Sequence, residues 1–312
     1  MRLETYGKIR NMDKLLGLIV CFSLLALPQA QAAVYGEDQR YLVSEDSTPA
    51  ILHWSKSVAS QLRTNPQSVG QGKSRITWKS LKEHIGLCED QKFSNVPTFS
   101  RCSGFLVEED LLVTAGHCVN DLNDCKKYKW AFTSEAQFDG EQIEIKDNDL
   151  YTCIEIVNRV KNPYSKNDFA LIRLNRSVKG RMPLKYRESG KIEDYETLAV
   201  IGNPSGLPLV VAPLGKILEN DSPFLFKTNN DTFAGNSGSP VFNENTGLVE
   251  GILTDGETDY IRQKDQTCSE NKQCTGATCR GENVVRITVI PELVPNMTPL
   301  EPVFKEGLPL SL

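Results

Sequence analysis

The chain has 312 residues, of which 39% are hydrophobic and 24% are charged, a composition typical of globular proteins. This length allows one large domain or two medium ones. The formal net charge is −5, and residues 1–32 carry four basic and two acidic side chains, so the remainder has a net charge of −7. An acidic chain without a dense Lys/Arg cluster lacks the basic face that phosphates require, which excludes nucleic acid as an expected partner.

The N-terminus has the pattern of a secretory signal peptide. Three basic residues between positions 8 and 14 precede the apolar run Leu15–Leu27, and the small-x-small motif Ala30–Ala32 follows. The run is too short to span a bilayer. We predict that residues 1–32 are removed, that the chain is secreted or periplasmic, and that no membrane attachment remains. An uncleaved anchor is the alternative.

The cysteine count also points to an exported protein. One of the nine cysteines, Cys21, lies in the predicted signal peptide, which leaves an even number in the mature chain. An even count in an exported chain suggests disulfides and an oxidising compartment. No C-x-x-C pair occurs, so a structural zinc site is a poor alternative. The eight remaining cysteines are Cys88, Cys102, Cys118, Cys125, Cys153, Cys268, Cys274 and Cys279.

From Ser103 onward, short apolar runs rich in β-formers alternate with turn residues. Gly104–Val107 and Leu111–Ala115 flank three acidic residues and predict a hairpin. Helical periodicity is nearly absent, so the pattern predicts an all-β protein built from barrels or sandwiches. Further strands are expected at Gln142–Ile145, Cys153–Val157, Asp168–Leu174, Thr197–Ile201, Leu209–Leu218, Phe224–Lys227, Val241–Asn243, Leu248–Thr254 and Val284–Ile290.

Four other segments lack this strand pattern. Residues 61–80 are polar and rich in Ser, Gln and Gly, and we expect a loop there. Residues 119–124 could form a helical turn, and the Lys/Arg-rich residues 176–194 are expected to connect two parts of the fold. The Pro-rich tail 291–312 is expected to be extended, because proline ends helices.

The stretch Asp231–Pro240 contains a serine, Ser237, in the sequence Gly-Asn-Ser-Gly-Ser-Pro. A serine between two glycines suggests a tight, exposed turn that presents a hydroxyl and directs backbone N–H groups toward one point. Acyl-transfer enzymes need these features, a nucleophile and an oxyanion hole. The same residues are also common in ordinary turns, so the stretch alone is a weak signal.

Two upstream motifs complete the set. Thr114-Ala115-Gly116-His117-Cys118 places His117 just after an apolar strand, and Asp168 begins the run Asp-Phe-Ala-Leu-Ile-Arg-Leu. A histidine can take the serine proton and return it to the leaving group. A buried aspartate holds the imidazole in the required tautomer. The order His, Asp, Ser is one of the known orders of this triad.

Together these motifs resemble the trypsin/chymotrypsin superfamily of serine endopeptidases, from about Cys102 to Val289. The segments Ala33–Arg40 and Gly235–Asn243 are most similar to its bacterial glutamyl endopeptidase branch. The resemblance implies two antiparallel β-barrels with the active site in the cleft between them. We expect the first barrel within residues 33–182 and the second within residues 183–290.

The resemblance also implies roles for single residues. His117 would act as general base and then acid, Asp168 would orient it, and Ser237 would attack the substrate carbonyl. The N–H groups of Gly235 and Ser237 would form the oxyanion hole, and Thr254 matches the serine that hydrogen-bonds the triad aspartate. Cys102 and Cys118 match the family disulfide beneath the histidine. The other six cysteines allow 15 pairings; we expect Cys125–Cys153 and two bridges among Cys88, Cys268, Cys274 and Cys279.

The resemblance places Asp231 where trypsins carry the carboxylate that selects Lys or Arg before the scissile bond. Thr232 is a residue that the glutamyl branch uses, but Leu253 replaces the histidine with which that branch binds a carboxylate. Gly256 would leave the pocket entrance open. The substrate-binding residues are therefore predicted to be Asp231, Thr232, Thr254 and Gly256, with a preference for Lys or Arg. A preference for small or apolar residues, or for glutamate, is the alternative.

A secreted binding protein on an inactive protease scaffold is the competing class of function. Such proteins usually lose a triad member or an oxyanion glycine, and this chain keeps them all. The expected partners are protein or peptide substrates, and the chain is expected to be a monomer. We expect no cofactor and no metal, because the Asp-rich segments 138–141 and 146–149 do not match a calcium loop.

Overall fold

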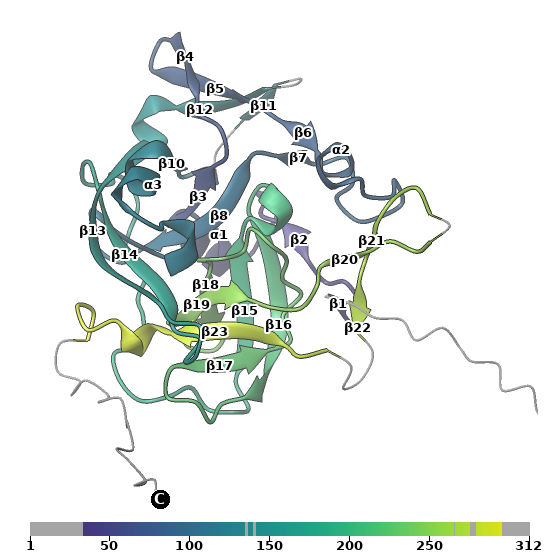
Figure 1. Ribbon diagram of the computed structural model, residues 1–312. Coiled ribbons are helices and arrows are strands. Elements are labelled where there is room, and N and C mark those ends of the chain that lie inside the picture. The colour runs from purple at the N-terminus through teal and green to yellow at the C-terminus, as the bar shows by residue number, and fades with distance from the viewer. Residues whose placement is uncertain (1–33, 135–136, 140–141, 265, 275–278, 295–312) are drawn as a thin grey trace, which may run out of the picture.

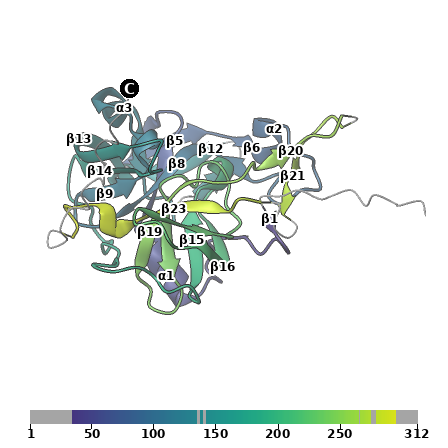
Figure 2. The same ribbon diagram turned by 60° about the horizontal axis from the view of Figure 1, so that its bottom comes forward.

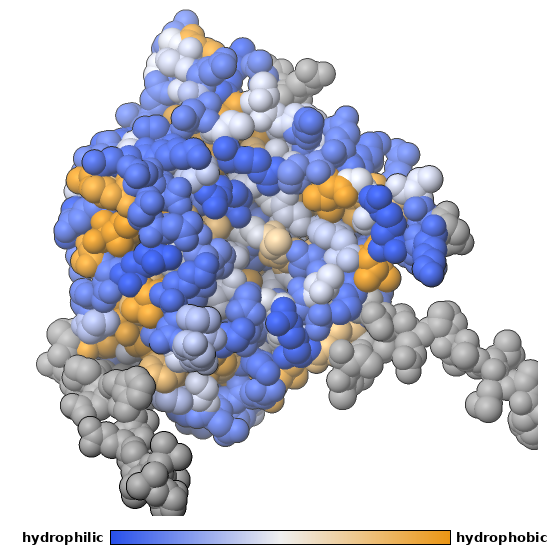
Figure 3. All heavy atoms as spheres, viewed as in Figure 1, coloured by the Kyte–Doolittle hydropathy of each residue, from blue (hydrophilic) through white to orange (hydrophobic). Residues whose placement is uncertain are grey.

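The computed structural model describes residues 34–134, 137–139, 142–264, 266–274 and 279–294. The predicted signal peptide and the tail after residue 294 lie outside these ranges. Most of the described regular structure is β-strand, which confirms the all-β class (Figure 1). None of the described helices is long and apolar enough to cross a bilayer. Hydrophilic side chains cover most of the face seen in Figure 3.

The first barrel is closed and its six strands are antiparallel. Its interior holds an apolar cluster that includes Trp130 and Tyr151. Pairing between the first and last strands of the series completes the ring. In barrel order the strands are β10 (Lys129–Ala131), β13 (Leu150–Lys161), β14 (Asp168–Leu174), β9 (Leu111–Thr114), β8 (Ser100–Leu106) and β3 (Val58–Leu62).

The second barrel is also a closed antiparallel ring of six strands, because β15 pairs with both β18 and β16. Phe226 and Val241 belong to the apolar cluster inside it. A short strand, β2 (Tyr41–Leu42), extends the sheet beside β16. In barrel order the strands are β15 (Thr197–Gly202), β18 (Pro240–Asn243), β19 (Val249–Asp255), β23 (Glu282–Arg286), β17 (Leu225–Thr228) and β16 (Val210–Glu219). The two-barrel architecture is therefore confirmed.

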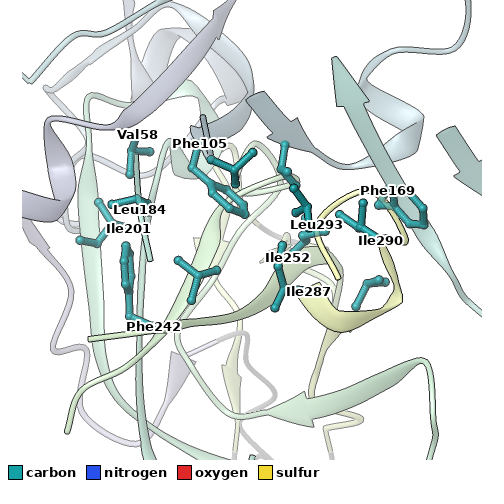
Figure 4. Close-up of a cluster of buried hydrophobic side chains, with 14 of the residues drawn as sticks. Val58, Phe105, Phe169, Leu184, Ile201, Phe242, Ile252, Ile287, Ile290 and Leu293 are labelled. Carbon is teal, nitrogen blue, oxygen red and sulfur yellow. The ribbon is translucent and has the colours of Figure 1, made fainter. Parts of the chain in front are cut away.

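An apolar seam joins the two barrels (Figure 4). Phe105 and Val113 of the first barrel lie in the same buried cluster as Ile252 of the second. Their neighbours Leu106 and Leu112 belong instead to the cluster inside the first barrel. Successive strand residues point to opposite faces, so β8 and β9 bury both faces. This double burial explains why consecutive positions are apolar in the predicted runs Gly104–Val107 and Leu111–Ala115.

The segment before the first barrel contains structure that the sequence pattern did not predict. The helix α1 (Pro49–Ser55) begins at Thr48, whose Oγ1 accepts a bond from the Ile51 N–H. Its Trp54 stacks on Phe242 of β18, with ring centroids 4.5 Å apart. α1 therefore packs against the second barrel although it precedes the first in sequence (Figure 2).

Residues 61–80 are not the predicted loop. They complete β3 and form β4 (Gln67–Gly70) and β5 (Lys73–Thr77), a hairpin that pairs with β12 (Gln142–Lys146). β5 alternates buried and half-buried side chains, and Ile76 packs with Ile143 in one apolar cluster. The polar composition hid these strands because one face of the sheet is exposed to solvent.

The remaining elements are short and lie mostly in the loops. One of them, the helix α3, begins slightly later than the helical turn expected at residues 119–124. These elements are β1 (Val34–Tyr35), β6 (Lys79–Ser80), α2 (Leu81–Ile85), β7 (Pro97–Thr98), η1 (Gly116–Cys118), α3 (Leu122–Lys127), β11 (Gln137–Asp139), η2 (Asp147–Asp149), η3 (Pro204–Gly206), β20 (Tyr260–Ile261), β21 (Glu270–Asn271), β22 (Gln273–Cys274) and η5 (Ile287–Val289).

Four disulfides link the described chain: Cys88–Cys268, Cys102–Cys118, Cys125–Cys153 and Cys274–Cys279. The predicted pairs Cys102–Cys118 and Cys125–Cys153 are confirmed. The remaining four cysteines form two bridges, as expected. The most distant pair in sequence, Cys88–Cys268, is separated by 180 positions and fastens the loop after α2 to the segment before β21.

We expect removal of this long-range bridge to destabilise the fold more than removal of the shortest one. In the chain-entropy relation, loss of Cys88–Cys268 lowers the free energy of unfolding by about 5 kcal/mol, and loss of Cys274–Cys279 lowers it by about 2 kcal/mol. Urea unfolding of the two double alanine variants measures both values. An equal loss in the two variants would contradict the prediction.

Candidate active site

Strand register brings the predicted histidine and aspartate together. β9 and β14 are antiparallel with Thr114 opposite Ala170, so the residues after Thr114 meet the beginning of β14. His117 lies in η1, just after β9, and Asp168 is the first residue of β14. His117 Nδ1 lies 2.8 Å from Asp168 Oδ2, and the His117 backbone N–H donates to Asp168 Oδ1 at 2.9 Å. The carboxylate therefore holds both the ring and the backbone of His117.

A glycine beside the histidine allows this approach. A β-carbon on Gly116 would lie 2.3 Å from the Val160 carbonyl oxygen and 2.8 Å from Asp168 Oδ1. Arg159 Nε donates to the Gly116 carbonyl at 2.7 Å from the other side. The Cys102–Cys118 disulfide then ties η1 to β8. Close packing, a hydrogen bond and a covalent bridge fix the position of His117.

The stretch around Ser237 forms two consecutive tight turns. The Asn236 N–H donates to the Phe233 carbonyl, and the Ser239 N–H donates to the Asn236 carbonyl. The third residue of each turn is a glycine with positive φ, 98° at Gly235 and 90° at Gly238. Positive φ at this position is typical of type II turns and favours glycine. Ser237 therefore lies where the two turns meet.

Contacts from both barrels hold these turns. The Ser103 N–H of β8 donates to the Ser237 carbonyl at 2.9 Å, and the Gly238 N–H donates to the Leu253 carbonyl of β19 at 2.7 Å. A β-carbon on Gly238 would lie 2.0 Å from the Ser103 carbonyl oxygen. The serine therefore lies in the seam between the barrels, on the same side as His117.

The two N–H groups predicted for the oxyanion hole are available. Within the described part of the chain, the backbone N–H groups of Gly235 and Ser237 form no hydrogen bond. The Gly235 carbonyl faces the other way and accepts a bond from Ser103 Oγ at 2.9 Å. The turn thus leaves both donors free to bind an acceptor from a substrate.

Thr254 has a different contact from the one predicted. Its Oγ1 donates to the Asn283 carbonyl at 3.3 Å and not to Asp168. Its own carbonyl accepts a bond from Ser237 Oγ at 3.1 Å. Among the described residues, no hydrogen bond joins Ser237 to His117. The expectation that Thr254 supports the aspartate is corrected, because β19 pairs with β23 and draws the threonine hydroxyl toward Asn283.

A cavity of about 300 Å³ adjoins Ser237. Three of the four predicted substrate-binding residues, Thr232, Thr254 and Gly256, line it together with His117 and Ser237. Apolar walls come from Phe233 and Leu253, and the acidic residues Asp255, Glu257, Asp259 and Glu282 also contribute to its lining.

Glu282 is the buried carboxylate of this cavity, with only 3% of its surface exposed. One of its oxygens accepts a bond from Thr232 Oγ1 at 2.6 Å, and the other accepts from the Glu257 N–H at 3.1 Å. A β-carbon on Gly256 would lie 1.7 Å from Glu282 Oε2, so glycine leaves the space that the carboxylate occupies. Burial raises the pKa of Glu282 to about 8, and Asp259 adds to the rise.

The other acidic groups of the cavity differ in their partners. Glu257 pairs with Lys272 at 2.7 Å, and the bond from Lys272 lowers the pKa of Glu257 to about 2. Asp259 accepts a bond from the Ala234 N–H at 2.7 Å, and burial raises its pKa to about 6. No described basic side chain forms an ion pair with Glu282 or Asp259. The cavity therefore contains acidic groups without a cation.

The structure places Asp231 outside this cavity, which corrects its predicted role. Asp231 accepts a bond from the Tyr35 N–H at 2.7 Å, next to the pairing of β1 with β22. Successive residues of an extended segment point to opposite sides, and Thr232 is the one that faces Glu282. Burial raises the pKa of Asp231 to about 6. Asp231 thus anchors the beginning of the described chain.

Glu282 was missed because it lies far from the sequence motifs. β-Sheet pairing brings it to the site, since Thr228 is opposite Glu282 and Asp255 is opposite Asn283. The sequence offers one signal for it: Glu282 is an acidic residue directly before the segment Val284–Ile290, which is predicted to be a strand.

The residues near the site that could bind a metal ion are already bonded to other groups of the protein. Cys102, His117 and Cys118 have their ligand atoms within 4.8 Å of one another, the only such group among the described residues. The two cysteines form a disulfide with each other, so neither can supply a thiolate.

Solved structures with matching chains include several proteases. The Rv3671c protease from M. tuberculosis in its active form is 13% identical, with 81% of this chain and 86% of that chain covered and a TM-score of 0.41. A Glu endopeptidase in complex with MPD is 18% identical, with 77% and 93% covered and a TM-score of 0.42. The serine endoprotease from Yersinia pestis is 14% identical, with 79% and 66% covered and a TM-score of 0.43. These scores are too low to carry an argument about substrates or residue roles.

No curated protein matches the sequence significantly. The family model of the trypsin-like peptidase domain matches residues 102–252, which include His117, Asp168 and Ser237. This match agrees with the two closed six-stranded antiparallel barrels and with the motifs on which the resemblance rests. The chain therefore contains a trypsin-like peptidase domain, the domain of a serine protease.

Proposed function

We propose that the protein is a serine endopeptidase in which Ser237 is the nucleophile, His117 the general base and acid, and Asp168 the group that orients the histidine. The observation that carries this proposal is that His117, which is held by Asp168, and Ser237 line one cavity from opposite barrels. Asp168 engages Nδ1, so Nε2 is the nitrogen free to accept a proton.

The reaction follows from these positions. Ser237 Oγ turns from the Thr254 carbonyl toward His117 and attacks the substrate carbonyl carbon as Nε2 takes its proton. The oxyanion accepts bonds from the Gly235 and Ser237 N–H groups. The C–N bond then breaks, and the leaving amine takes the proton from the imidazolium. Water hydrolyses the resulting acyl-enzyme with His117 again acting as base.

The cavity beside Ser237 supports a preference for Lys or Arg before the scissile bond. Its most buried carboxyl group is Glu282, and Asp259 adds a second carboxyl that forms no ion pair with a described residue. A buried carboxylate is costly unless a cation pairs with it. A substrate lysine or arginine would supply that cation while its methylene groups contact Phe233 and Leu253. The proposed preference thus rests on Glu282 and not on Asp231.

We also propose export, to the extracellular medium or the periplasm, after removal of residues 1–32. Four disulfides in the described chain support an oxidising compartment. The division at residues 182–183 falls in the connector between β14 and β15. This boundary, the monomeric state and the likeness to the glutamyl endopeptidase branch remain predictions.

Replacement of the nucleophile should abolish covalent labelling and activity. We expect Ser237→Ala to lose fluorophosphonate labelling and to lower kcat on a peptide substrate by about 10⁶-fold, because no other group can form the acyl-enzyme. Ser189→Ala, at an exposed serine in the connector, is the matched control and should label fully. Labelling of Ser237→Ala, or no labelling of the wild type, would contradict the triad assignment and favour a non-catalytic binding protein.

An isosteric pair of variants tests the cavity residue. We expect Glu282→Gln to lower the preference for Arg over Gln before the scissile bond by about 100-fold, because a desolvated charge partner is lost. Asp231→Asn should leave this preference unchanged. In the wild type the Arg/Gln ratio of kcat/KM should rise with pH, since Glu282 is protonated below its pKa of about 8 and binds a cation when ionised.

A peptide-library cleavage profile of the three proteins gives these ratios. A wild-type preference for apolar residues or for glutamate would reject the proposed specificity. A loss of preference in Asp231→Asn but not in Glu282→Gln would return the role to Asp231.

A further inference from the structure

A second cavity, of about 380 Å³, lies between the end of β3, the segment from β5 to α2, and the approach to β8. The charged or ionisable residues that line it are Arg63, Lys79 and His84, and no acidic residue does. Trp78 and Phe99 form its apolar walls. The cavity is therefore basic, although the chain as a whole is acidic.

The cationic groups of this cavity have no acidic partners. Arg63 Nη1 lies 2.6 Å from His84 Nε2, and Arg63 Nη2 donates to the Ser100 carbonyl at 2.8 Å. In the described part of the chain, no carboxylate lies within ion-pair distance of Arg63, Lys79 or the nearby Arg101. Burial, Arg63 and Lys79 all lower the pKa of His84, and burial and Arg101 lower that of Arg63. Lys79 contributes to the lowered pKa of Glu83, and Arg101 contributes to that of Asp124, so the positive potential is offset in part, although no described carboxylate forms an ion pair with these cations.

This cavity adjoins the proposed oxyanion hole. A β-carbon on Gly206 would lie 2.9 Å from Arg63 Nη2, and one on Gly235 would lie 3.1 Å from the Gly206 nitrogen. Gly206 therefore lies between Arg63 and the Gly235 turn. β8 provides a second connection, because it runs from Ser100, the acceptor of the Arg63 bond, to Cys102 beneath the catalytic histidine.

The basic cavity and the Glu282 cavity are formed by different elements of the fold. Glu282 begins β23, in the second barrel, whereas β6 and α2 lie above β23 in both ribbon views (Figures 1 and 2). A substrate whose basic residue enters the Glu282 cavity must leave Ser237 on the opposite side, past the Gly235 turn. Only Gly206 separates Arg63 from the Gly235 turn, and two or three residues of extended chain span about 7–10 Å, which is enough to reach Arg63 from the scissile bond.

We propose that the basic cavity binds an acidic side chain of the substrate, two or three residues after the scissile bond. This inference rests on the proposed endopeptidase function and deepens it. The preferred substrate would have Lys or Arg before the cleaved bond and Asp or Glu shortly after it. A carboxylate would pair with Arg63 and Lys79, the two cations that form no ion pair with a described residue, and would contact His84 beside them.

Paired peptides test the inference. Each pair keeps Arg before the bond and carries Glu or Gln at the first, second or third position after it. We expect kcat/KM to be about 5-fold higher for Glu at the second or third position, a typical effect of a partly exposed ion pair, and the difference to shrink in high salt. The double variant Lys79→Gln/His84→Gln should bring the Glu/Gln ratio close to one. Lys179→Gln removes an exposed lysine near Glu109 and should keep the ratio.

The outcomes separate the two proposals. If the wild type cleaves no peptide, the proposed function fails. If it cleaves Glu and Gln peptides with equal kcat/KM, only the role of the basic cavity fails. An equal fall in kcat/KM for Glu and Gln peptides in the double variant would show a structural effect and would also overturn the inference.

Discussion

The packing of the Ser237 turns into the seam between the barrels is the contact on which the site depends. Gly238 has no side chain, and the Ser103 carbonyl of the first barrel occupies the place of a β-carbon. The Ser103 N–H holds the Ser237 carbonyl, while Leu253 holds the Gly238 N–H from the second barrel. Each barrel supplies part of the chemistry, so their relative position must be held by direct contacts. The apolar seam supplies the driving force, and these hydrogen bonds set the register.

Burial of acidic groups distinguishes the cavity beside Ser237 from the rest of the surface. Glu282 keeps two hydrogen bonds, but no described cation pairs with it, and its carboxyl therefore favours the protonated form at neutral pH. Glu257 contributes less negative potential because Lys272 neutralises it. The chain thus holds an unpaired carboxyl where a substrate side chain would enter. Beyond Gly206 from the Gly235 turn the charges are reversed, because Arg63 and Lys79 line a cavity there and form no ion pair with a described residue.

The sequence was most informative where function depends on short segments. The His117 motif, the Asp168 strand and the glycine turn around Ser237 are each local, and the structure brings His117, with Asp168 bound to it, to the cavity that Ser237 lines. Most predicted strands after Ser103 are present, because apolar runs between turn residues are a local signal. Residues 61–80 escaped prediction because β4 and β5 are half-exposed and polar, and only pairing with β12 makes them strands.

By itself, the sequence determined the all-β class, the triad candidates and two of the disulfides through motifs and a family resemblance. Only the tertiary structure decided the cavity residues. Asp231 and Thr232 are neighbours, and the direction in which each points depends on the β1 segment and Glu282 around them. Glu282 reaches the site through long-range pairing of β17, β23 and β19, which no local pattern encodes. Which carboxyl faces a cavity is a property of packing, because every strand offers two faces.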